Sequence, residues 1–293
     1  MISPHDERCD IGLRPMTQAD IPLGLRLTTV AGWNQTEADW QMLLAAGFGL
    51  VATRGTADVG TATIVPYGTA FSWIGMVLVD PAYRRRGVRT ALLERAIADA
   101  KPYGCVRLDA TPQGEPLYAR MGFRAEYGLL RMVRRSRDLP APADAVMPAG
   151  SVCRALGLVG LPDLVAFDSP IFGAARDTIL GALARAIPYA FVSPQGDALR
   201  GYCLGRSGAA YEQIGPVVAE HVEIAEALLC RALVVCGDRP VVVDAFAAKP
   251  GWVGFLQSLG FAAQRPYTRM ILGCDCPTGM PERQYAIAGA EIG

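Results

Sequence analysis

The stretch that decides the fold reads Met76-Val77-Leu78-Val79-Asp80-Pro81-Ala82-Tyr83-Arg84-Arg85-Arg86-Gly87-Val88-Arg89-Thr90-Ala91-Leu92-Leu93. It begins as an apolar strand, breaks at Asp80-Pro81 and becomes helical from about Gly87. A strand that enters a helix through such a loop leaves the first helical N–H groups without partners, and with the helix dipole they form an anion site. Glycine lets a ligand approach the backbone, and the arginines raise the positive potential. The stretch favours a pyrophosphate-binding loop; a merely solvated basic surface is the alternative.

The elements around this stretch follow a definite order. Thr17 with Asp20 and Thr36 with Asp39 have the spacing of a capping box, so a helix is expected to begin at each pair. We expect further helices at 87–100 and 116–121, and strands at 10–16, 49–53, 59–65, 71–79, 105–110 and 122–133. The resulting order, β-α-α-β-β-β-α-β-α-β, predicts an α+β fold with a mixed sheet.

The loop and this order together resemble the GNAT (GCN5-related) N-acetyltransferases, whose acyl-CoA loop has the pattern Arg/Gln-x-x-Gly-x-Gly/Ala. Arg84 and Gly87 match the pattern, and Arg89 departs from it. The resemblance implies acetyl-CoA as co-substrate, held by the last strand residues through their backbone and by the loop. The implied contacts are Val77, Leu78, Val79, Arg84, Arg85, Arg86, Gly87, Val88, Arg89 and Thr90.

The second half of the chain partly repeats the first. Gly122-Phe123 and Arg131-Met132 recur as Gly260-Phe261 and Arg269-Met270, offset by 138 residues in both cases. The segment 220–226, which corresponds to the arginine loop, is acidic and lacks glycine, so it should repel a pyrophosphate. The sequence therefore predicts two tandem GNAT-like folds, the second degenerate and without the cofactor, as in some bacterial members; chance similarity is the alternative.

These repeats set the expected domain boundaries. We expect an acetyl-CoA-binding GNAT domain at 1–135, a Pro- and Ala-rich linker at 136–150, and a GNAT-like domain without the CoA loop at 151–293. Within the last, 157–167 and 173–187 look helical and are joined by a turn at 168–172. Residues 285–288 could add a strand.

Tyr118 is the candidate catalytic residue. Residues 118–123 resemble the family's Tyr-x-x-x-Gly-Phe signature, in which the phenol acts as general acid toward the leaving thiolate. The alternative is a tyrosine that only packs on the sheet. The repeat places Leu256, which cannot donate a proton, at the matching position of the second copy. The general base stays open between Asp109, Glu115 and a chain of water molecules.

The acceptor pocket is expected at the turn between the first two helices. In GNAT proteins this turn lines the pocket, and here it carries Trp33, Asn34, Gln35 and, slightly further on, Trp40. Aromatic walls with two amides suit a primary amine or an amino-acid-like molecule; a helix cap with a buried tryptophan is the alternative. From the second half, Asp168 is expected to attract a cationic amine and Arg176 to hold a carboxylate; a local Asp–Arg pair is the alternative.

Composition and sequence patterns argue against several classes of function. The formal net charge is zero and 19% of residues are charged, which argues against a nucleic-acid partner. The sequence has neither a run of about 18 apolar residues for a membrane span nor the apolar core of a signal peptide. The Cys274-x-Cys276 pair is poor zinc spacing, so no metal is expected. The cysteines in apolar surroundings are expected to be reduced: Cys105, Cys203, Cys230 and Cys236. We therefore expect a cytoplasmic protein, and it is expected to be a monomer or a homodimer.

The sequence thus predicts an N-acetyltransferase that moves the acetyl group of acetyl-CoA to a primary amine of a small molecule by direct attack, with Tyr118 as general acid. A non-catalytic acyl-CoA-binding regulatory module is the second possibility, because Arg89 departs from the loop pattern and no base is identified. Nucleic-acid binding is a third, supported only by the arginines at 84–89 and 131–137.

Overall fold

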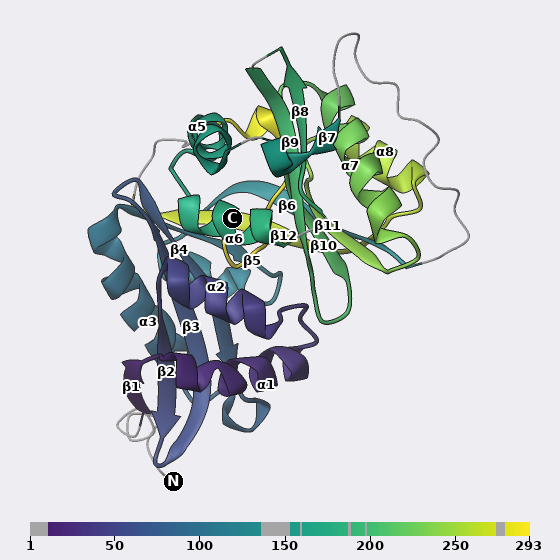
Figure 1. The fold of residues 1–293 in the computed structure, drawn as a ribbon. Helices are drawn as coiled ribbons and strands as arrows, with labels where there is room; N and C mark the ends of the chain where they lie inside the picture. The colour runs from purple at the N-terminus through teal and green to yellow at the C-terminus, as the bar shows by residue number, and fades with distance from the viewer. Residues whose placement is uncertain (1–10, 136–152, 159, 187–188, 197, 274–278) are drawn as a thin grey trace. The chain divides into compact units, whose positions relative to one another are not determined.

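The computed structural model describes residues 11–135, 153–158, 160–186, 189–196, 198–273 and 279–293. Contacts divide the chain after Leu108 into two compact units (Figure 1), with the single exception of Ile292, which counts with unit 1. Unit 1 therefore ends inside the first repeat, and α4 (Glu115–Arg120) and β6 (Arg124–Arg134) of that repeat belong to unit 2. The predicted linker at 136–150 lies outside the described residues, and the sequence domains at 1–135 and 151–293 stay a prediction.

Unit 1 is built on a sheet in the order β1-β2-β3-β4-β5. The first four strands are antiparallel neighbours, and β5 runs parallel to β4. Figure 1 shows α1 and α2 crossing the front of this sheet. The bounds are β1 Ile11–Pro15, α1 Ile21–Ala31, α2 Glu37–Ala46, β2 Phe48–Arg54, β3 Ala57–Tyr67, β4 Phe71–Val79, α3 Val88–Ala100 and β5 Cys105–Ala110.

Local chemistry starts the two front helices where the sequence predicts. The backbone N–H of Thr36 donates to Asp39 at 2.7 Å, and the Asp39 N–H donates back to the Thr36 hydroxyl at 3.4 Å. Thr17 and Asp20 form the same box before the short 3₁₀ turn that leads into α1. The helices then pack closely, because a Cβ added at Gly24 would come within 2.6 Å of the Trp40 ring.

The strands of unit 2 follow the order β12-β6-β11-β13-β10-β9-β8-β7. Strand β6 lies between β12 and β11 and is antiparallel to both. A buried ion pair fixes this position, since the guanidinium of Arg131 on β6 meets both oxygens of Asp244 on β11 at 2.7 Å. The strands are β6 Arg124–Arg134, β7 Arg154–Ala155, β8 Phe191–Gln195, β9 Ala198–Ser207, β10 Glu212–Ala219, β11 Val241–Phe246, β12 Ala262–Leu272 and β13 Gln284–Ala286.

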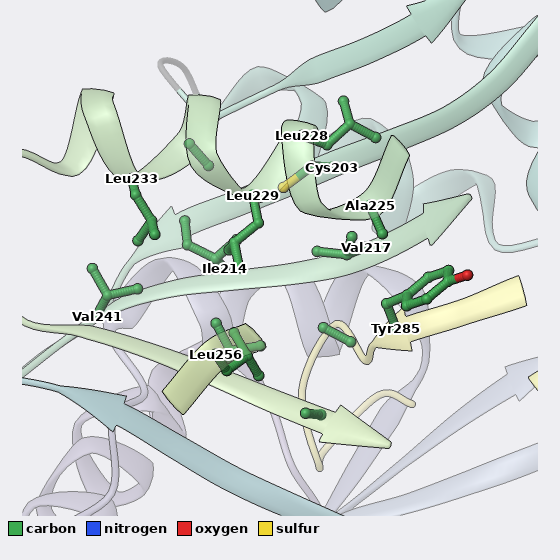
Figure 2. Packing of buried hydrophobic residues seen from close by; sticks show 14 of the residues in the cluster. Cys203, Ile214, Val217, Ala225, Leu228, Leu229, Leu233, Val241, Leu256 and Tyr285 are labelled. Carbon is green, nitrogen blue, oxygen red and sulfur yellow. The ribbon is translucent and has the colours of Figure 1, made fainter. Parts of the chain in front are cut away.

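The helices of unit 2 cover an apolar core. They are α4 Glu115–Arg120, α5 Leu161–Phe172, α6 Asp177–Arg185, α7 Val222–Cys236 and α8 Pro250–Ser258. Figure 2 shows Leu229 and Leu233 of α7 directed at the strand that carries Ile214 and Val217, and all four side chains belong to one buried cluster. Burial of such side chains is the main favourable contribution to folding, and Met132 of β6 also belongs to this core.

The last strand fills a gap in the sheet of unit 2. Strands β10 and β11 pair in parallel only at their beginnings, through Glu212–Val241 and Gln213–Val242. Beyond that point β13 lies between them, with Ala286 opposite Val217 on one side and Ala245 on the other. The chain approaches β10 so closely that a Cβ at Gly215 would lie 2.0 Å from the carbonyl oxygen of Ile287.

Several expectations need correction. The turn predicted at 168–172 is wrong, because α5 continues to Phe172 with Pro170 inside it. Pro170 has no N–H to donate to the preceding turn, and α5 ends shortly after it, where Gly173 follows in a left-handed conformation with φ of 99°. Reduced cysteines are confirmed for Cys203, Cys230 and Cys236 but not for Cys105, which is disulfide-bonded. A strand is present near the suggested range 285–288, but it spans Gln284–Ala286, so it begins one residue earlier and ends two residues earlier. In the part of the chain that the structure describes, no helix is long and apolar enough to cross a membrane.

Candidate functional site

Strand β4 separates from β5 after a short stretch of pairing. Phe71, Ser72 and Trp73 pair with Cys105, Val106 and Arg107. Beyond Trp73, β4 runs on to Val79, and no strand among the described residues lies between it and β5. Val77 and Val79 are half-buried, and Leu78 is buried. The edge of β4 therefore offers backbone N–H and C=O groups to an extended ligand.

A bulge interrupts the same strand. Thr61 and Thr63 of β3 face Leu78 and Gly75 of β4, so β4 carries one extra residue at this point. Met76 adopts a left-handed conformation with φ of 50° although it is not glycine. Such a conformation is rare for a bulky side chain and has to be held by its surroundings. The hydroxyl of Thr61 donates to the Met76 carbonyl at 3.0 Å. No sequence pattern that we used signals this bulge.

The predicted anion loop follows directly. A 3₁₀ turn at Pro81–Tyr83 leads to exposed Arg84, Arg85 and Arg86, and then Gly87 begins α3 in a left-handed conformation with φ of 82°. The first helical bond joins the Ala91 N–H to the Gly87 carbonyl at 3.0 Å. The N–H groups of Val88 and Thr90 precede it, and a helix supplies no acceptor of its own to its first N–H groups. Glycine has no side chain to cap them, so the start of α3 suits an anion.

Polar contacts hold this loop in shape. Asp80 accepts from the Ala82 N–H at 3.0 Å and forms an ion pair with Arg26 of α1. The Arg26 guanidinium, followed by the Ala82 N–H, keeps the pKa of Asp80 below its ordinary value. Arg84 donates from Nε to the Val79 carbonyl at 3.2 Å, which ties the loop back to the end of β4.

The predicted acceptor residues fall into two groups. Asn34 and Gln35 are buried and Trp33 is half-buried, and all three lie in the turn between α1 and α2. The Gln35 Oε1 atom has no hydrogen-bond partner among the described residues. Trp40, in contrast, is completely buried against Gly24, which makes its ring part of the core of unit 1.

Tyr118 lies on α4 in unit 2, as the sequence predicts for the short helix. Its side chain is 7% exposed and its ring meets Phe123 edge to face at 6.0 Å. The Tyr118 carbonyl accepts from the Phe123 N–H at 3.1 Å. This local bond fixes the turn between α4 and β6 and with it the direction of the tyrosine. Leu256, its counterpart on α8, is fully buried.

Both carboxylates considered as bases have other partners. The fully buried side chain of Asp109 forms a two-bond ion pair with Arg269 of β12, at 2.8 Å for each bond. Glu115 accepts from the hydroxyl of Thr268 at 2.8 Å. Because Arg269 occupies both oxygens of Asp109, this carboxylate is better explained as an anchor for β12. The sequence alone does not reveal these pairs, because their members are far apart along the chain.

Asp168 and Arg176 do come together, but inside unit 2. Arg176 contacts both carboxylate oxygens of Asp168, at 2.8 and 2.9 Å, and both side chains are buried. Tyr202 also donates to Asp168, and the Gly293 carbonyl accepts from Arg176 at 3.1 Å. The pair is thus satisfied by groups of its own unit and belongs to the core rather than to a surface that a substrate reaches.

The counterpart of the anion loop in unit 2 carries the opposite charge. Glu220 precedes α7 and forms ion pairs with Arg200 at 2.7 Å and Arg283 at 2.9 Å. Glu223 lies in the first turn of the helix. Glu220 thus engages the arginines nearby, and Glu223 in the first helical turn disfavours a pyrophosphate. Among the described residues, no three histidine, cysteine or carboxylate side chains are grouped as metal ligands.

Comparisons with known proteins agree with this geometry. Two models described as acetyltransferase (GNAT) domains match residues 46–125 and 164–286. The chain is 27% identical over 212 residues to YitH, an uncharacterized N-acetyltransferase of Bacillus subtilis (strain 168). The aligned residues cover 71% of this chain and 72% of that protein.

Solved structures show the same fold at low sequence identity. A protein assigned as an acetyltransferase from Pyrococcus horikoshii is 22% identical, with a TM-score of 0.79 over 97% of this chain and 96% of its own. A tandem GNAT protein from the clavulanic acid biosynthesis pathway is 15% identical, with a TM-score of 0.66 over 91% and 99%. Two GNAT domain matches that together span most of the described chain leave one conclusion: this acyltransferase belongs to the GNAT N-acetyltransferase family and is a tandem member of it.

Proposed function

We propose that the protein transfers the acetyl group of acetyl-CoA to a primary amine of a small molecule, and that acetyl-CoA binds to unit 1. One observation carries the proposal: β4 leaves β5 after Trp73 and runs into an α3 whose N-terminus is capped only by Gly87. An open strand edge suits the amide-containing pantetheine arm, and the helix N-terminus with three exposed arginines suits the pyrophosphate. Val77, Leu78, Val79 and residues 84–90 would hold the co-substrate.

The chemistry needs few protein groups. Acetyl-CoA supplies an activated acetyl group as a thioester. The amine nitrogen forms a bond to the acetyl carbon while the carbon–sulfur bond breaks, the nitrogen loses a proton, and the sulfur gains one. We assign the proton for sulfur to the Tyr118 hydroxyl, on the strength of the resemblance of residues 118–123 to the family signature. The proton from nitrogen goes to water, since Asp109 is bound to Arg269.

The amine is proposed to meet the turn between α1 and α2. Gln35 supports this, because its buried Oε1 has no partner among the described residues and can accept from an N–H donor. Asn34 and the half-buried Trp33 complete the wall. Trp40, Asp168 and Arg176 are left out of the proposed contact surface, because each is buried within its own unit.

Unit 2 is proposed to bind no acetyl-CoA. The gap between β10 and β11 corresponds to the gap between β4 and β5, and β13 already occupies it. Glu220 and Glu223 stand where unit 1 has its arginines. Leu256 replaces the acid. The strand gap, the anion loop and the proton donor are therefore all altered in the second copy.

Calorimetry and a thiol-release assay test the proposal together. Acetyl-CoA titrated into the full chain should bind with one site per chain. A panel of aliphatic amines, amino acids and amino sugars should contain at least one compound that releases CoA and yields an N-acetylated product. Absence of binding, or two equal sites, would contradict the assignment to unit 1.

The second candidate is an acyl-CoA-binding regulatory module without turnover. The engagement of Asp109 and Glu115 in other contacts favours it, because neither is then an evident base. One acetyl-CoA bound per chain without thiol release from any amine would support this function over catalysis. The cytoplasmic location and the monomeric or dimeric state stay predictions.

A further inference from the structure

The bulge in β4 fixes the direction of one peptide group. The peptide that joins Met76 and Val77 is planar and trans, so its C=O and N–H point in opposite directions. The Met76 carbonyl points to the hydroxyl of Thr61 on β3. The Val77 N–H consequently points away from β3, toward the edge of β4 that has parted from β5.

This orientation depends on the hydrogen bond from Thr61, because the backbone pairing between β3 and β4 is interrupted at the bulge. Met76 is 2% exposed and has a φ of 50°, so its backbone is strained and its carbonyl is shielded from water. A buried carbonyl without a partner is unfavourable. The bulge removes the Met76 peptide from regular pairing with β3, and the fully buried Thr61 replaces that pairing with its side chain.

We propose that Thr61 is a positioning residue for acyl transfer: its hydroxyl holds the Met76–Val77 peptide so that the Val77 N–H faces the carbonyl of the bound thioester. Thr61 acts through the backbone and does not touch the substrate. This inference rests on the proposed binding of acetyl-CoA along β4. A donor held in place before the reaction stabilises the negative charge that develops on the carbonyl oxygen during acyl transfer.

The same strand provides a matched control. Thr63 lies two residues further on, so its side chain is on the same face of β3. It is also fully buried, and its hydroxyl has no partner among the described residues. Thr63→Val therefore makes the same chemical change at the same depth without removing a hydrogen bond from β4.

The experiment compares thiol release with binding of CoA, which lacks the acetyl group. Thr61→Val should lower kcat by about 10–100-fold, since a misplacement of about 1 Å can cost about 100-fold. Its Kd for CoA should stay within about twofold of the wild-type value, because the anion loop is unchanged. Thr61→Ser, which restores the hydroxyl, should recover most of kcat, and Thr63→Val should match the wild type.

Each other outcome is decisive. If Thr61→Val turns over at the wild-type rate, if it loses CoA binding in the same proportion as kcat, or if Thr61→Ser stays as slow as the valine variant, the inference is wrong. Thr61→Ala carries the same expectations if the valine variant does not fold. Failure of the wild type itself to bind CoA would instead refute the proposed function.

Discussion

At the scale of single residues, the structure separates side chains that act locally from those that hold distant segments together. Asp109 has the residue type and the strand-end position of a catalytic base, yet it is bound to Arg269, 160 positions away. Arg269 also donates to the hydroxyl of Tyr127 at 2.8 Å. Removing one partner of such a buried pair leaves an uncompensated charge, so a loss of activity on substituting Asp109 would not identify a base.

Tyr118→Phe tests the proposed acid. The variant keeps the ring that packs on Phe123 and removes only the hydroxyl. We expect kcat to fall by about 10²–10⁴-fold, the usual effect of losing a proton-transfer group, while acetyl-CoA still binds with wild-type affinity in calorimetry. An unchanged rate in single-turnover thiol release would show that Tyr118 only packs against its neighbours.

Asp20 gives a pH dependence of stability. Its hydrogen bond from Arg14 is the main cause that lowers the pKa of the carboxyl to about 2 from 3.8, against burial, which raises it. A lowered pKa in the folded state stabilises the protein above the unfolded pKa, and the contribution disappears as pH falls toward 2. Asp20→Asn, which can still cap a helix, should lose about 1–2 kcal/mol at pH 7, because Arg14 is partly exposed and screened.

Chemical denaturation at several pH values measures this contribution. The difference between wild type and Asp20→Asn should be constant above about pH 5 and should shrink between about pH 4 and pH 2. A difference that persists unchanged at the lowest pH would mean that packing, and not the charge of Asp20, explains the loss.

At the scale of elements, local sequence patterns predict the bounds of an element correctly where the residues of that element alone determine them. The bounds of β4 and β5 are as predicted, because alternating or continuous apolar runs end at turn residues on both sides. Both capping boxes are present as predicted, because each is formed by two residues three positions apart in the sequence. The bulge at Met76 escaped prediction, since it depends on a side chain from the neighbouring strand.

The helix N-terminus at Gly87 can be tested against a second glycine. Gly87→Glu places a negative side chain at the proposed pyrophosphate site and should abolish acetyl-CoA binding in calorimetry. Gly55, in the turn between β2 and β3, also has a positive φ, of 58°, and a Cβ there would meet nothing within 4 Å. Gly55→Glu therefore has a similar backbone strain, of about 1 kcal/mol, and should bind acetyl-CoA normally. Equal loss in both variants would point to misfolding.

At the scale of the whole molecule, the repeat in the sequence and the units in the structure have different boundaries. The family patterns place α4 and β6 in the first repeat, but contacts place them in unit 2. Strand β6 has β12 on one edge and β11 on the other, in ladders of nine and six paired residues. Strand pairing between distant segments leaves no signal in a single sequence, because each strand keeps the same alternation whichever neighbour it finds.

This arrangement predicts that the first repeat does not fold alone. A fragment of residues 1–140 retains β6 but lacks both of its neighbours, so it exposes two strand edges and the apolar side chains of Leu129 and Met132. It also leaves Arg131 without Asp244, its buried partner. Exposed edges of this kind lead to aggregation. We expect the fragment to be insoluble, or to lack a cooperative thermal transition.

Co-expression tests whether the fragment fails to fold because β6 lacks its neighbouring strands or for another reason. Residues 141–293, supplied as a separate chain, contain β11 and β12 and should recover 1–140 in a soluble complex of defined size on gel filtration. Asp244→Arg in the second chain should prevent recovery, because it places a second cation against Arg131 in a buried position. A soluble, monomeric 1–140 fragment that melts like the full chain would show that β6 can pair within the first repeat, and that the sequence boundary at 135 is also the boundary of folding.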